Sequence, residues 1–538
     1  MEKFYLKSVA LGALLALSAN AMAGDIYVSA SGSDANDGSS AANALATVNA
    51  AVAKAVSGDV IKVTGKVKVD ETIKLEAFGD LTIEGTSSAG ECTLDGQKKV
   101  QILNVLNTNL TLRNLTITKG YVEAEKNARG GAMWCRGKVV TIDGCVFSSN
   151  ETPTRNEDNG GAIFVTDGTL NISSSKFTKN VAYRGGAIEA QASTLNISNT
   201  EFSKNYTMAA EGSNSGASSG GALAIGKSTT EMKYVTLTNN SATGRGGAMI
   251  VWIDGTNGKK LNMMGCAVLN NEAGSPGGAF NFGLNNDGDF RYNILSTTIY
   301  GNTTTGGAGG VVAIDSPNSN AGQQMNFVNC TITGNSTALN VGNCGGFAVN
   351  GGSKLKAKLN IVNTILEGNS SSQGWSDSRF ARNEDPDYVT VINSIIGHAF
   401  RDVNDGELKN VTNSVINSTG QNKDNPLTAG LVDDIVEDCL PLKADSKCLT
   451  MGSVEEAAKY GCTVDQKGQP WTKPYIGAVQ LVEGEDIPEA PTAIKGVEVA
   501  GADKQGFVDN AYYTLQGVRV AKPGKGVFIH NGKKIVVK

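Results

Sequence analysis

Three arginines in the middle of the chain each stand directly before a pair of glycines: Arg129, Arg184 and Arg245. A guanidinium group pairs well with a carboxylate, including that of an acidic sugar. If the three positions are equivalent in the fold, the arginines form a basic stripe that binds an acidic glycan or supports its lysis. Ion pairing with Glu123 or Glu189 is the alternative, and it is the one we favour.

A second group of chemically active side chains lies in residues 374–388, which read GWSDSRFARNEDPDY. Trp375, Arg379, Arg382 and Asp385 are our candidate ligand-binding residues here, because aromatic and arginine side chains dominate many recognition surfaces. The alternative is a solvated corner loop whose aromatic rings pack on the coil beneath it, and the sequence favours that alternative.

The candidate metal ligands are Asp34, Asn36 and Asp37, since oxygen ligands at alternate loop positions suit Ca²⁺. This loop lacks the bidentate glutamate of a typical calcium loop, and as a turn it needs no metal. The turn at residues 285–289 has the same ambiguity. With two histidines and no closely spaced cysteine pair, a zinc-type site is not indicated. Ca²⁺ is therefore the single cofactor under consideration.

We assign no catalytic residue from the sequence. A glycoside hydrolase needs two or three carboxylates on one face, and a lyase needs a base beside a charge neutraliser. Asp433 and Asp434 form an isolated acidic pair, His398 follows an apolar run typical of a structural position, and His530 lies in a polar tail. None of them has partners in the sequence that would complete an active site.

The elements that must position these residues are internal repeats. One signal is a Gly-Gly pair followed by a small or apolar residue. It alternates with a second signal, a short strand-like run that ends in asparagine. Eight asparagines occupy this end position: Asn150, Asn180, Asn205, Asn240, Asn271, Asn302, Asn335 and Asn369.

Each repeat contains three short alternating segments, and such a unit cannot bury its own apolar face. Stacked copies give a parallel β-helix, in which equivalent residues lie about 4.8 Å apart along the axis. The asparagines then form a ladder of stacked amides, and each Gly-Gly pair marks a sharp corner. The apolar pattern of residues 45–56 predicts a short helix that caps the open end of the first coil.

The N-terminus has the features of a secretory signal peptide. Lys3 and Lys7 precede the apolar residues 9–17, and Ala23 ends a small-residue cleavage pattern. No later run reaches the length of a membrane span, so we expect no transmembrane helix in the mature chain. The predicted divisions are a signal peptide (1–23), a cap with the first coils (24–100), the β-helix repeats (101–400), the last coils with a closing segment (401–481), a linker (482–492) and a β-rich tail (493–538).

Composition narrows the classes further. The 47 basic and 52 acidic side chains are nearly balanced, which does not favour a nucleic-acid partner. Nine cysteines leave at least one thiol unpaired. Cys145 and Cys330 fall where other repeats carry small residues, so we expect them to be buried. Cys439, Cys448 and Cys462 cluster late in the chain, and one disulfide among them is plausible.

Several stretches resemble known families. The opening IYVSASGSDANDGSSAANALATVNAAVAKAVSGDVIKV resembles the start of right-handed parallel β-helix proteins of the pectate-lyase-like superfamily. The GGA(I/L/M) and FxxN alternation is similar to the repeats of polymorphic outer-membrane proteins, which are surface adhesins. The tail YYTLQGVRVAKPGKGVFIHNGKKIVVK resembles C-terminal sorting tails of exported Bacteroidota proteins, some of which use type IX secretion.

Together these features predict an all-β, right-handed parallel β-helix that is secreted or held at the outer membrane or cell surface of a Gram-negative bacterium. We expect an adhesin-like binding role or a structural role, with a glycan or a host or microbial surface protein as partner. The tail would engage the export machinery. The alternative is a polysaccharide lyase or glycoside hydrolase, since this fold hosts both enzymes and binding proteins.

Overall fold

The computed structural model describes residues 23–485 except for 123–127, 156, 212–216, 253–257, 286–289, 308, 319–322, 340–343, 352–356, 373, 376, 381–387, 398, 401–407, 409 and 418–426, together with four strands of the C-terminal tail. The signal-peptide prediction therefore lies almost entirely outside the described residues. The chain divides into two units, at Val497 and Glu498, and each is described here by itself.

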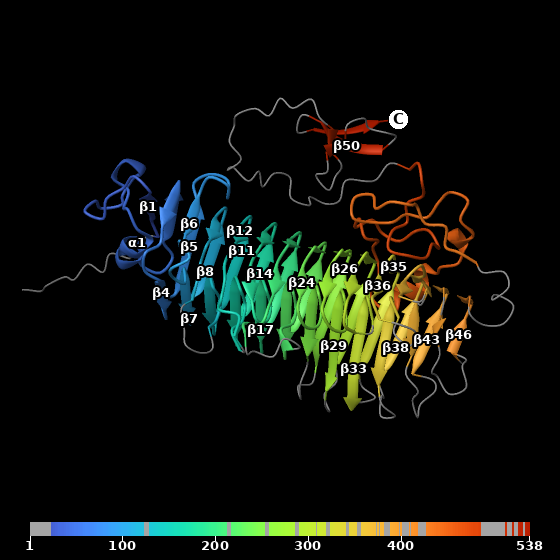
Figure 1. The fold of residues 1–538 in the computed structure, drawn as a ribbon. Coiled ribbons are helices and arrows are strands. Elements are labelled where there is room, and N and C mark those ends of the chain that lie inside the picture. Colours follow the sequence, from blue (N-terminus) through green and yellow to red (C-terminus); the bar gives the residue numbers. More distant parts are fainter. Residues whose placement is uncertain are drawn as a thin grey trace, which may run out of the picture. The chain divides into compact units, whose positions relative to one another are not determined.

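The first unit is a right-handed parallel β-helix, which confirms the predicted fold class (Figure 1). Its coils stack in sequence order, so that the strands of each sheet come from successive coils. Sheet A has 14 strands: β1 (Asp25–Ser29), β2 (Val60–Thr64), β5 (Asp80–Gly85), β8 (Asn109–Arg113), β11 (Val139–Asp143), β14 (Thr169–Ser173), β18 (Thr194–Ser198), β22 (Thr229–Lys233), β26 (Lys259–Met264), β30 (Phe290–Leu295), β34 (Gln324–Val328), β38 (Lys358–Val362), β43 (Val389–Ile392) and β46 (Asn410–Thr412).

Sheets B and C complete the three long walls of the coil. Sheet B has 13 strands: β3 (Lys66–Lys68), β6 (Thr93–Asp95), β9 (Thr116–Thr118), β12 (Val146–Ser148), β15 (Lys176–Thr178), β19 (Glu201–Ser203), β23 (Thr236–Thr238), β27 (Ala267–Leu269), β31 (Thr298–Tyr300), β35 (Thr331–Thr333), β39 (Ile365–Leu366), β44 (Ile395–Ile396) and β47 (Val415–Ile416). Sheet C has 12 strands: β4 (Ile73–Glu76), β7 (Leu103–Leu106), β10 (Met133–Arg136), β13 (Ile163–Thr166), β17 (Ile188–Gln191), β21 (Leu223–Gly226), β25 (Met249–Trp252), β29 (Phe280–Asn285), β33 (Val312–Asn318), β37 (Phe347–Gly351), β42 (Ser378–Phe380) and β45 (Ala399–Phe400).

A fourth, narrow sheet corrects the expectation of three strands per coil. A complete coil runs through sheets C, A, B and then D, as in β13, β14, β15 and β16. The strands of sheet D are two residues long, too short to show an alternating pattern in the sequence. They are β16 (Val181–Ala182), β20 (Tyr206–Thr207), β24 (Ser241–Ala242), β28 (Glu272–Ala273), β32 (Thr303–Thr304), β36 (Ser336–Thr337), β40 (Ser370–Ser371) and the antiparallel β41 (Gly374–Trp375).

The core of the β-helix is a stack of equivalent inward side chains. In β14, for example, Leu170 and Ile172 are buried while their neighbours are partly exposed. Phe147, Phe177 and Phe202 stack in successive coils, with ring centroids 4.8 and 4.9 Å apart. The strand spacing thus fixes the distance between stacked rings, and each coil buries its apolar face on its neighbours.

The asparagine ladder lies at the corner between sheets B and D. Each amide Nδ2 donates to the Oδ1 of the next asparagine along the stack, at 2.8–3.0 Å. The backbone N–H of each asparagine donates to the same oxygen. The row ends at Asp377, whose Oδ1 accepts both hydrogen bonds of Asn369, at 2.7 and 2.8 Å. A carboxylate at the amide-NH₂ end of the row suits the aligned dipoles of the amides.

The Gly-Gly pairs form the corner between sheets D and C. At Gly185 the backbone takes a φ of +59°, a conformation that disfavours residues with a Cβ. At Gly186 a Cβ atom would lie 2.2 Å from the carbonyl oxygen of Gly221 in the next coil. Both glycines are needed for the coils to turn this tightly and still stack.

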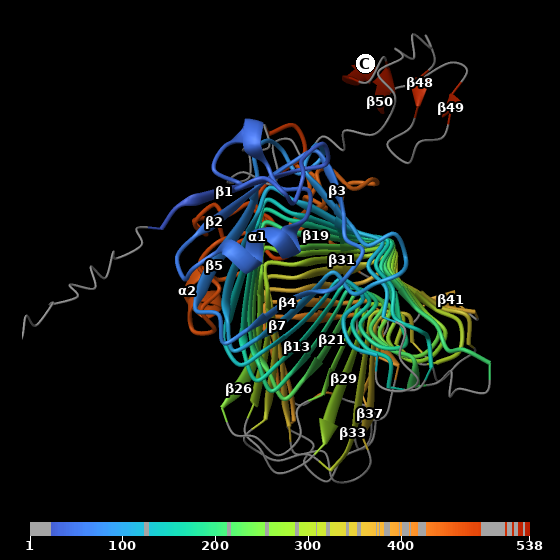
Figure 2. The same ribbon diagram turned by 90° about the vertical axis from the view of Figure 1, so that its left-hand side faces the viewer.

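The N-terminal end of the stack is covered by the helix α1 (Val48–Lys54), preceded by the 3₁₀ turn η1 (Ala41–Asn43). Thr47 is the N-cap of α1, and its side chain accepts from the N–H of Ala50 at 3.1 Å. Val48 and Ala51 are buried against the first coil. Figure 2 looks along the stack from this end and shows α1 in front of the first strands.

Residues 427–485 return along the side of the β-helix, and we call them the lateral segment. They contain η4 (Lys447–Thr450) and α2 (Val454–Ala458). Trp471 packs in a cluster with Leu295 and Val328 of sheet A, and Asp438 accepts a hydrogen bond from Thr236 at 3.2 Å. The lateral segment therefore packs on the outer surface of several coils of the β-helix.

All nine cysteines are unpaired and buried, so the late disulfide that the sequence suggested is not formed. Its three candidate members lie in different apolar clusters. Cys462 packs with Trp471, Cys448 with Ile476, and Cys439 with Val479.

The second unit is an antiparallel sheet in the order β49 (Arg519–Val520), β48 (Tyr512–Tyr513), β50 (Gly526–His530) and β51 (Lys533–Val537). Strands β50 and β51 pair in antiparallel orientation over five residues each. Across the described residues, no helix has the length and apolar character that crossing a membrane requires.

Candidate ligand-binding face

The three arginines lie in one row at the corner between sheets D and C. Isolated parallel bridges join Arg129 to Asn159, Asn159 to Arg184, and Arg184 to Ser219. The N–H of Gly220 then donates to the carbonyl of Arg245 in the next coil. The row therefore has an arginine in every second coil, with a small polar residue in each coil between them.

Aromatic rings hold the first two guanidinium groups over the outer face of sheet C. The guanidinium of Arg129 lies 5.0 Å from the ring centre of Phe164 and 5.8 Å from that of Trp134. The guanidinium of Arg184 lies 5.5 Å from the ring centre of Trp252. Such stacking is favourable for a cation and restricts where a long side chain points. Arg245 is exposed.

Glu189 lies on the same outer face, in register with Phe164 of the preceding coil, and its side chain is fully buried. Its Oε1 accepts from Gln191 Nε2 at 2.8 Å, and its Oε2 lies 3.8 Å from Arg184 Nε. Burial raises the pKa of Glu189 to about 6, although both Arg184 and Arg129 favour the charged form. The ion pair that the sequence favoured thus exists for Arg184, while Glu123 lies outside the described residues.

Three polar atoms along this face are buried and lack a hydrogen-bond partner among the described residues: Asn104 Oδ1, Trp134 Nε1 and Glu189 Oε2. All three side chains belong to one register row, in which Asn104 pairs with Trp134, Trp134 with Phe164, and Phe164 with Glu189. Buried polar groups in native proteins are normally hydrogen-bonded. These three polar atoms without hydrogen-bond partners, beside two arginines, therefore mark a part of the outer face of sheet C that can accommodate a polar group of a ligand.

Sequence reasoning missed the aromatic residues of this face, although a signal for them exists. Trp134, Phe164 and Glu189 each stand four positions after the first glycine of a Gly-Gly pair. The two core residues that flank each of them point inward, so this position points outward. Aligning the repeats on the glycines places these side chains in one row.

The residues singled out in 374–388 are only partly described. Arg379 belongs to β42 and continues the same outward row of sheet C, where it pairs with Ala348. Phe380 is buried in the core. The side chain of Trp375, and Arg382 and Asp385, lie outside the described residues. The structure therefore places Arg379 on the candidate face, several coils beyond Glu189.

The candidate calcium ligands make hydrogen bonds within their own loop. Asp34 Oδ1 accepts from the N–H groups of Ala46 and Thr47, both at 2.9 Å, and Asp34 Oδ2 accepts from Thr47 Oγ1 at 2.9 Å. Asn36 donates to the carbonyl of Ala44, and Asp37 accepts from the N–H and hydroxyl of Ser39. These bonds define the turn that leads into α1.

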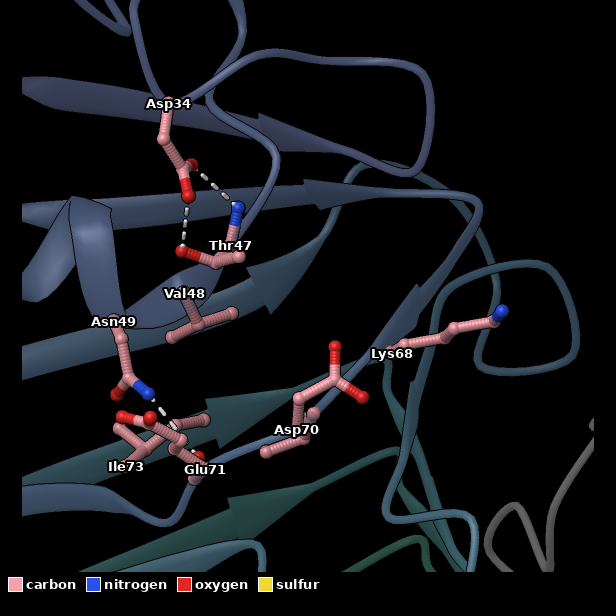
Figure 3. Close-up of a pocket in the computed structure, with 9 residues that line it drawn as sticks. Asp34, Thr47, Val48, Asn49, Lys68, Asp70, Glu71 and Ile73 are labelled. Atoms are coloured by element: carbon pink, nitrogen blue, oxygen red, sulfur yellow. Dashed lines mark hydrogen bonds between the residues drawn. The ribbon is translucent and has the colours of Figure 1, made fainter.

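A cavity of about 260 Å³ adjoins this loop (Figure 3). In Figure 3 both oxygens of Asp34 turn toward Thr47, and Lys68 points away from the other labelled side chains. Asp70 also lines the cavity, but across the described chain no three His, Cys, Asp or Glu side chains are grouped to hold a metal ion.

A second, polar hollow of about 560 Å³ lies on the outer face of sheet A and is lined by Asn171, Asn196, Glu231 and Lys233, among others. The asparagines around it bond mainly to one another: Asn196 donates to Asn171 at 2.8 Å, and Asn262 donates to Glu231 at 2.9 and 3.0 Å. The hydrogen-bonding groups of this outer row on sheet A are largely paired with one another, unlike those of the row on sheet C.

The fold and this face define a right-handed parallel β-helix protein with an arginine–aromatic row along one wall. No family model matches the chain, and no curated protein matches it. Among solved structures it is similar to the complex of XylC with xylose, at a TM-score of 0.40 and 9% identity, over 85% of this chain and 98% of that chain. A likeness at that level carries no argument about function.

Proposed function

We propose that this protein is an exported, extracellular or cell-surface β-helix protein that binds acidic glycans along the arginine row of sheet C. One observation carries the proposal: Arg129 and Arg184 are stacked on aromatic rings beside the buried Glu189, whose Oε2 has no hydrogen-bond partner among the residues that the structure describes. Stacked guanidinium groups are pre-organised to pair with carboxylates, and aromatic side chains offer flat apolar surface to sugar rings.

The test is a binding measurement on the purified mature chain with a panel of acidic and neutral polysaccharides. Acidic glycans should bind and neutral ones should not, and the affinity should fall as salt rises. A variant with Arg129→Gln and Arg184→Gln should lose at least about tenfold in affinity, as expected when charged hydrogen bonds are removed. Arg291→Gln, an exposed arginine on sheet A, is the matched control. Equal binding by both variants would contradict the proposal.

A polysaccharide lyase is the second candidate, because Glu189, with a pKa raised to about 6, lies beside Arg184 in the arrangement that an elimination needs. An arginine would neutralise the substrate carboxylate, and Glu189 would take the proton from the adjacent ring carbon. A C=C bond would form as the glycosidic C–O bond breaks, and the departing sugar oxygen would be protonated by water. The unsaturated product is detected by its ultraviolet absorbance. Its appearance, and its loss in Glu189→Gln, would establish lysis; binding without product leaves the adhesin-like role.

Export and surface location are proposals that rest on the N-terminal leader and the C-terminal tail. Deleting residues 493–538 should leave the β-helix folded, because the tail forms a separate unit, but should change where the protein accumulates. Cell fractionation measures this, and unchanged localisation would contradict a sorting role for the tail.

A further inference from the structure

The arginine row has a period of two coils. Arg129, Arg184 and Arg245 alternate with Asn159 and Ser219 along the same corner. Neighbouring parallel strands lie about 4.8 Å apart, so successive arginines start about 9.6 Å apart along the axis. The two intervening positions are uncharged.

The intervening residues are also buried, with exposures of 6% for Asn159 and 2% for Ser219. Asn159 Oδ1 accepts from Arg184 Nε at 3.4 Å, and Ser219 Oγ accepts from the N–H of Arg245 at 3.4 Å. Both residues thus already accept a hydrogen bond from the arginine of the following coil. A ligand carboxylate opposite either of them would meet no cation and would lose hydration without compensation.

The stacking contacts restrain the long arginine side chains, so that the guanidinium groups keep the spacing of their backbone positions. Arg129 is held on Phe164 of the following coil, and Arg184 is held on Trp252 and near Glu189. A side chain restrained before binding loses less conformational entropy when it pairs with a ligand. The row therefore places guanidinium groups at intervals of two strand spacings, with that of Arg184 shared with the buried Glu189.

We infer that the preferred ligand is a polysaccharide with one acidic sugar in each disaccharide repeat, lying along the β-helix axis with its carboxylates opposite successive arginines. Each sugar ring of an extended chain advances by roughly one strand spacing, so acidic groups on alternate rings match the arginine period. A polymer of uronic acid alone carries a carboxylate on every ring, and the carboxylates of the intervening rings have no arginine of this row to pair with. This inference rests on the proposed function and specifies its ligand class.

The experiment compares hyaluronan oligosaccharides, which carry a carboxylate on alternate sugars, with galacturonate oligosaccharides that carry the same number of carboxylates on adjacent sugars. Affinities for the full mature chain are measured by calorimetry at one ionic strength. We expect the alternating oligosaccharide to bind about tenfold more tightly, the factor that one additional charged pair supplies. Equal or tighter binding of galacturonate would overturn the inference and leave acidic-glycan binding intact. Binding of neither would overturn both.

Variants on the row give a second readout. Arg245 is exposed, so Arg245→Gln should fold normally and should weaken hyaluronan binding several-fold while changing galacturonate binding less. Arg291→Gln on sheet A should change neither. If Arg245→Gln and Arg291→Gln weaken both ligands equally, binding depends on overall charge and not on the period of the row.

Discussion

Two rows of polar side chains run along this β-helix, and they differ in how completely their hydrogen bonds are satisfied. In the asparagine ladder between sheets B and D, each of the eight buried amides accepts from the preceding coil; seven donate to the next asparagine, and the last, Asn369, donates to Asp377. On the outer face of sheet C, Asn104, Trp134 and Glu189 lie in one register row but keep atoms without hydrogen-bond partners in the described part of the chain. The first row is complete in itself and holds coils together, whereas the second has hydrogen-bonding capacity left for a ligand.

The largest expected effect on stability comes from interrupting the asparagine ladder. Asn240→Ala removes the side-chain donor to Asn271 Oδ1 and to the carbonyl of Phe202. It also removes the acceptor of the N–H and Nδ2 of Asn205, so these two donors are left buried without that partner. The free energy of unfolding should fall by roughly 3 kcal/mol, measured by urea titration, with no change in glycan affinity.

The matched control is Asn196→Ala on the exposed outer row of sheet A, where one hydrogen bond to Asn171 is lost. It should cost less than about 1 kcal/mol. Equal costs for the two substitutions would show that burial of the ladder adds nothing to stability.

A smaller effect should come from Glu189, and it should depend on pH. Because the folded-state pKa of Glu189 is raised to about 6, the folded protein binds a proton that the unfolded chain releases between about pH 4.5 and 6. Stability therefore falls as pH rises through this window. Glu189→Gln should be more stable than the wild type by about 2 kcal/mol at pH 8 and should match it at pH 4.

The control for that prediction is Glu272→Gln, since Glu272 is exposed on sheet D. Its stability should follow the wild type at every pH. A constant difference between Glu189→Gln and the wild type across the pH range would rule out titration of Glu189 as the cause.

The smallest effect concerns Asp34, which belongs to neither row. Asp34→Ala removes three hydrogen bonds at the entry to α1 and should cost less than about 1 kcal/mol. The melting temperature of the wild type should be unchanged by Ca²⁺ or a chelator, as differential scanning calorimetry can measure. A rise of several degrees with Ca²⁺ would show that the folded protein binds the ion.

The repeats were sufficient to predict the fold class, because the Gly-Gly corners and the asparagine ends recur in a fixed order and such short segments bury their apolar faces by stacking on copies of themselves. The lateral segment was harder to foresee. Trp471 packs on Leu295 and Val328, more than a hundred residues earlier in the chain, and no local pattern encodes such a contact. Asp377 was also missed, because it completes the ladder from only eight residues after Asn369 and directly before β42, a position at which the repeat pattern does not place a ladder residue.

The candidate face was visible in the sequence only as three arginines. Their common row follows from equivalent positions before the glycines, but their environment does not. Glu189 is an outward residue that is nevertheless fully buried, and Trp134 is an outward residue whose ring nitrogen is buried, with an arginine guanidinium near each side chain. An alternating pattern predicts which way a side chain points from a sheet, and not what lies over it.

The unpaired cysteines are buried, so their reaction with an alkylating reagent would report local unfolding of the protein. Their sulfurs are shielded from solvent, from Cys92 near the first coils to Cys462 in the lateral segment. Burial raises the pKa of Cys145 to about 12 and that of Cys462 to about 11, which makes both poor nucleophiles in the folded state. Alkylation followed by peptide mass spectrometry would therefore time the exposure of each thiol, and would show whether the stack frays from one end or the lateral segment detaches first.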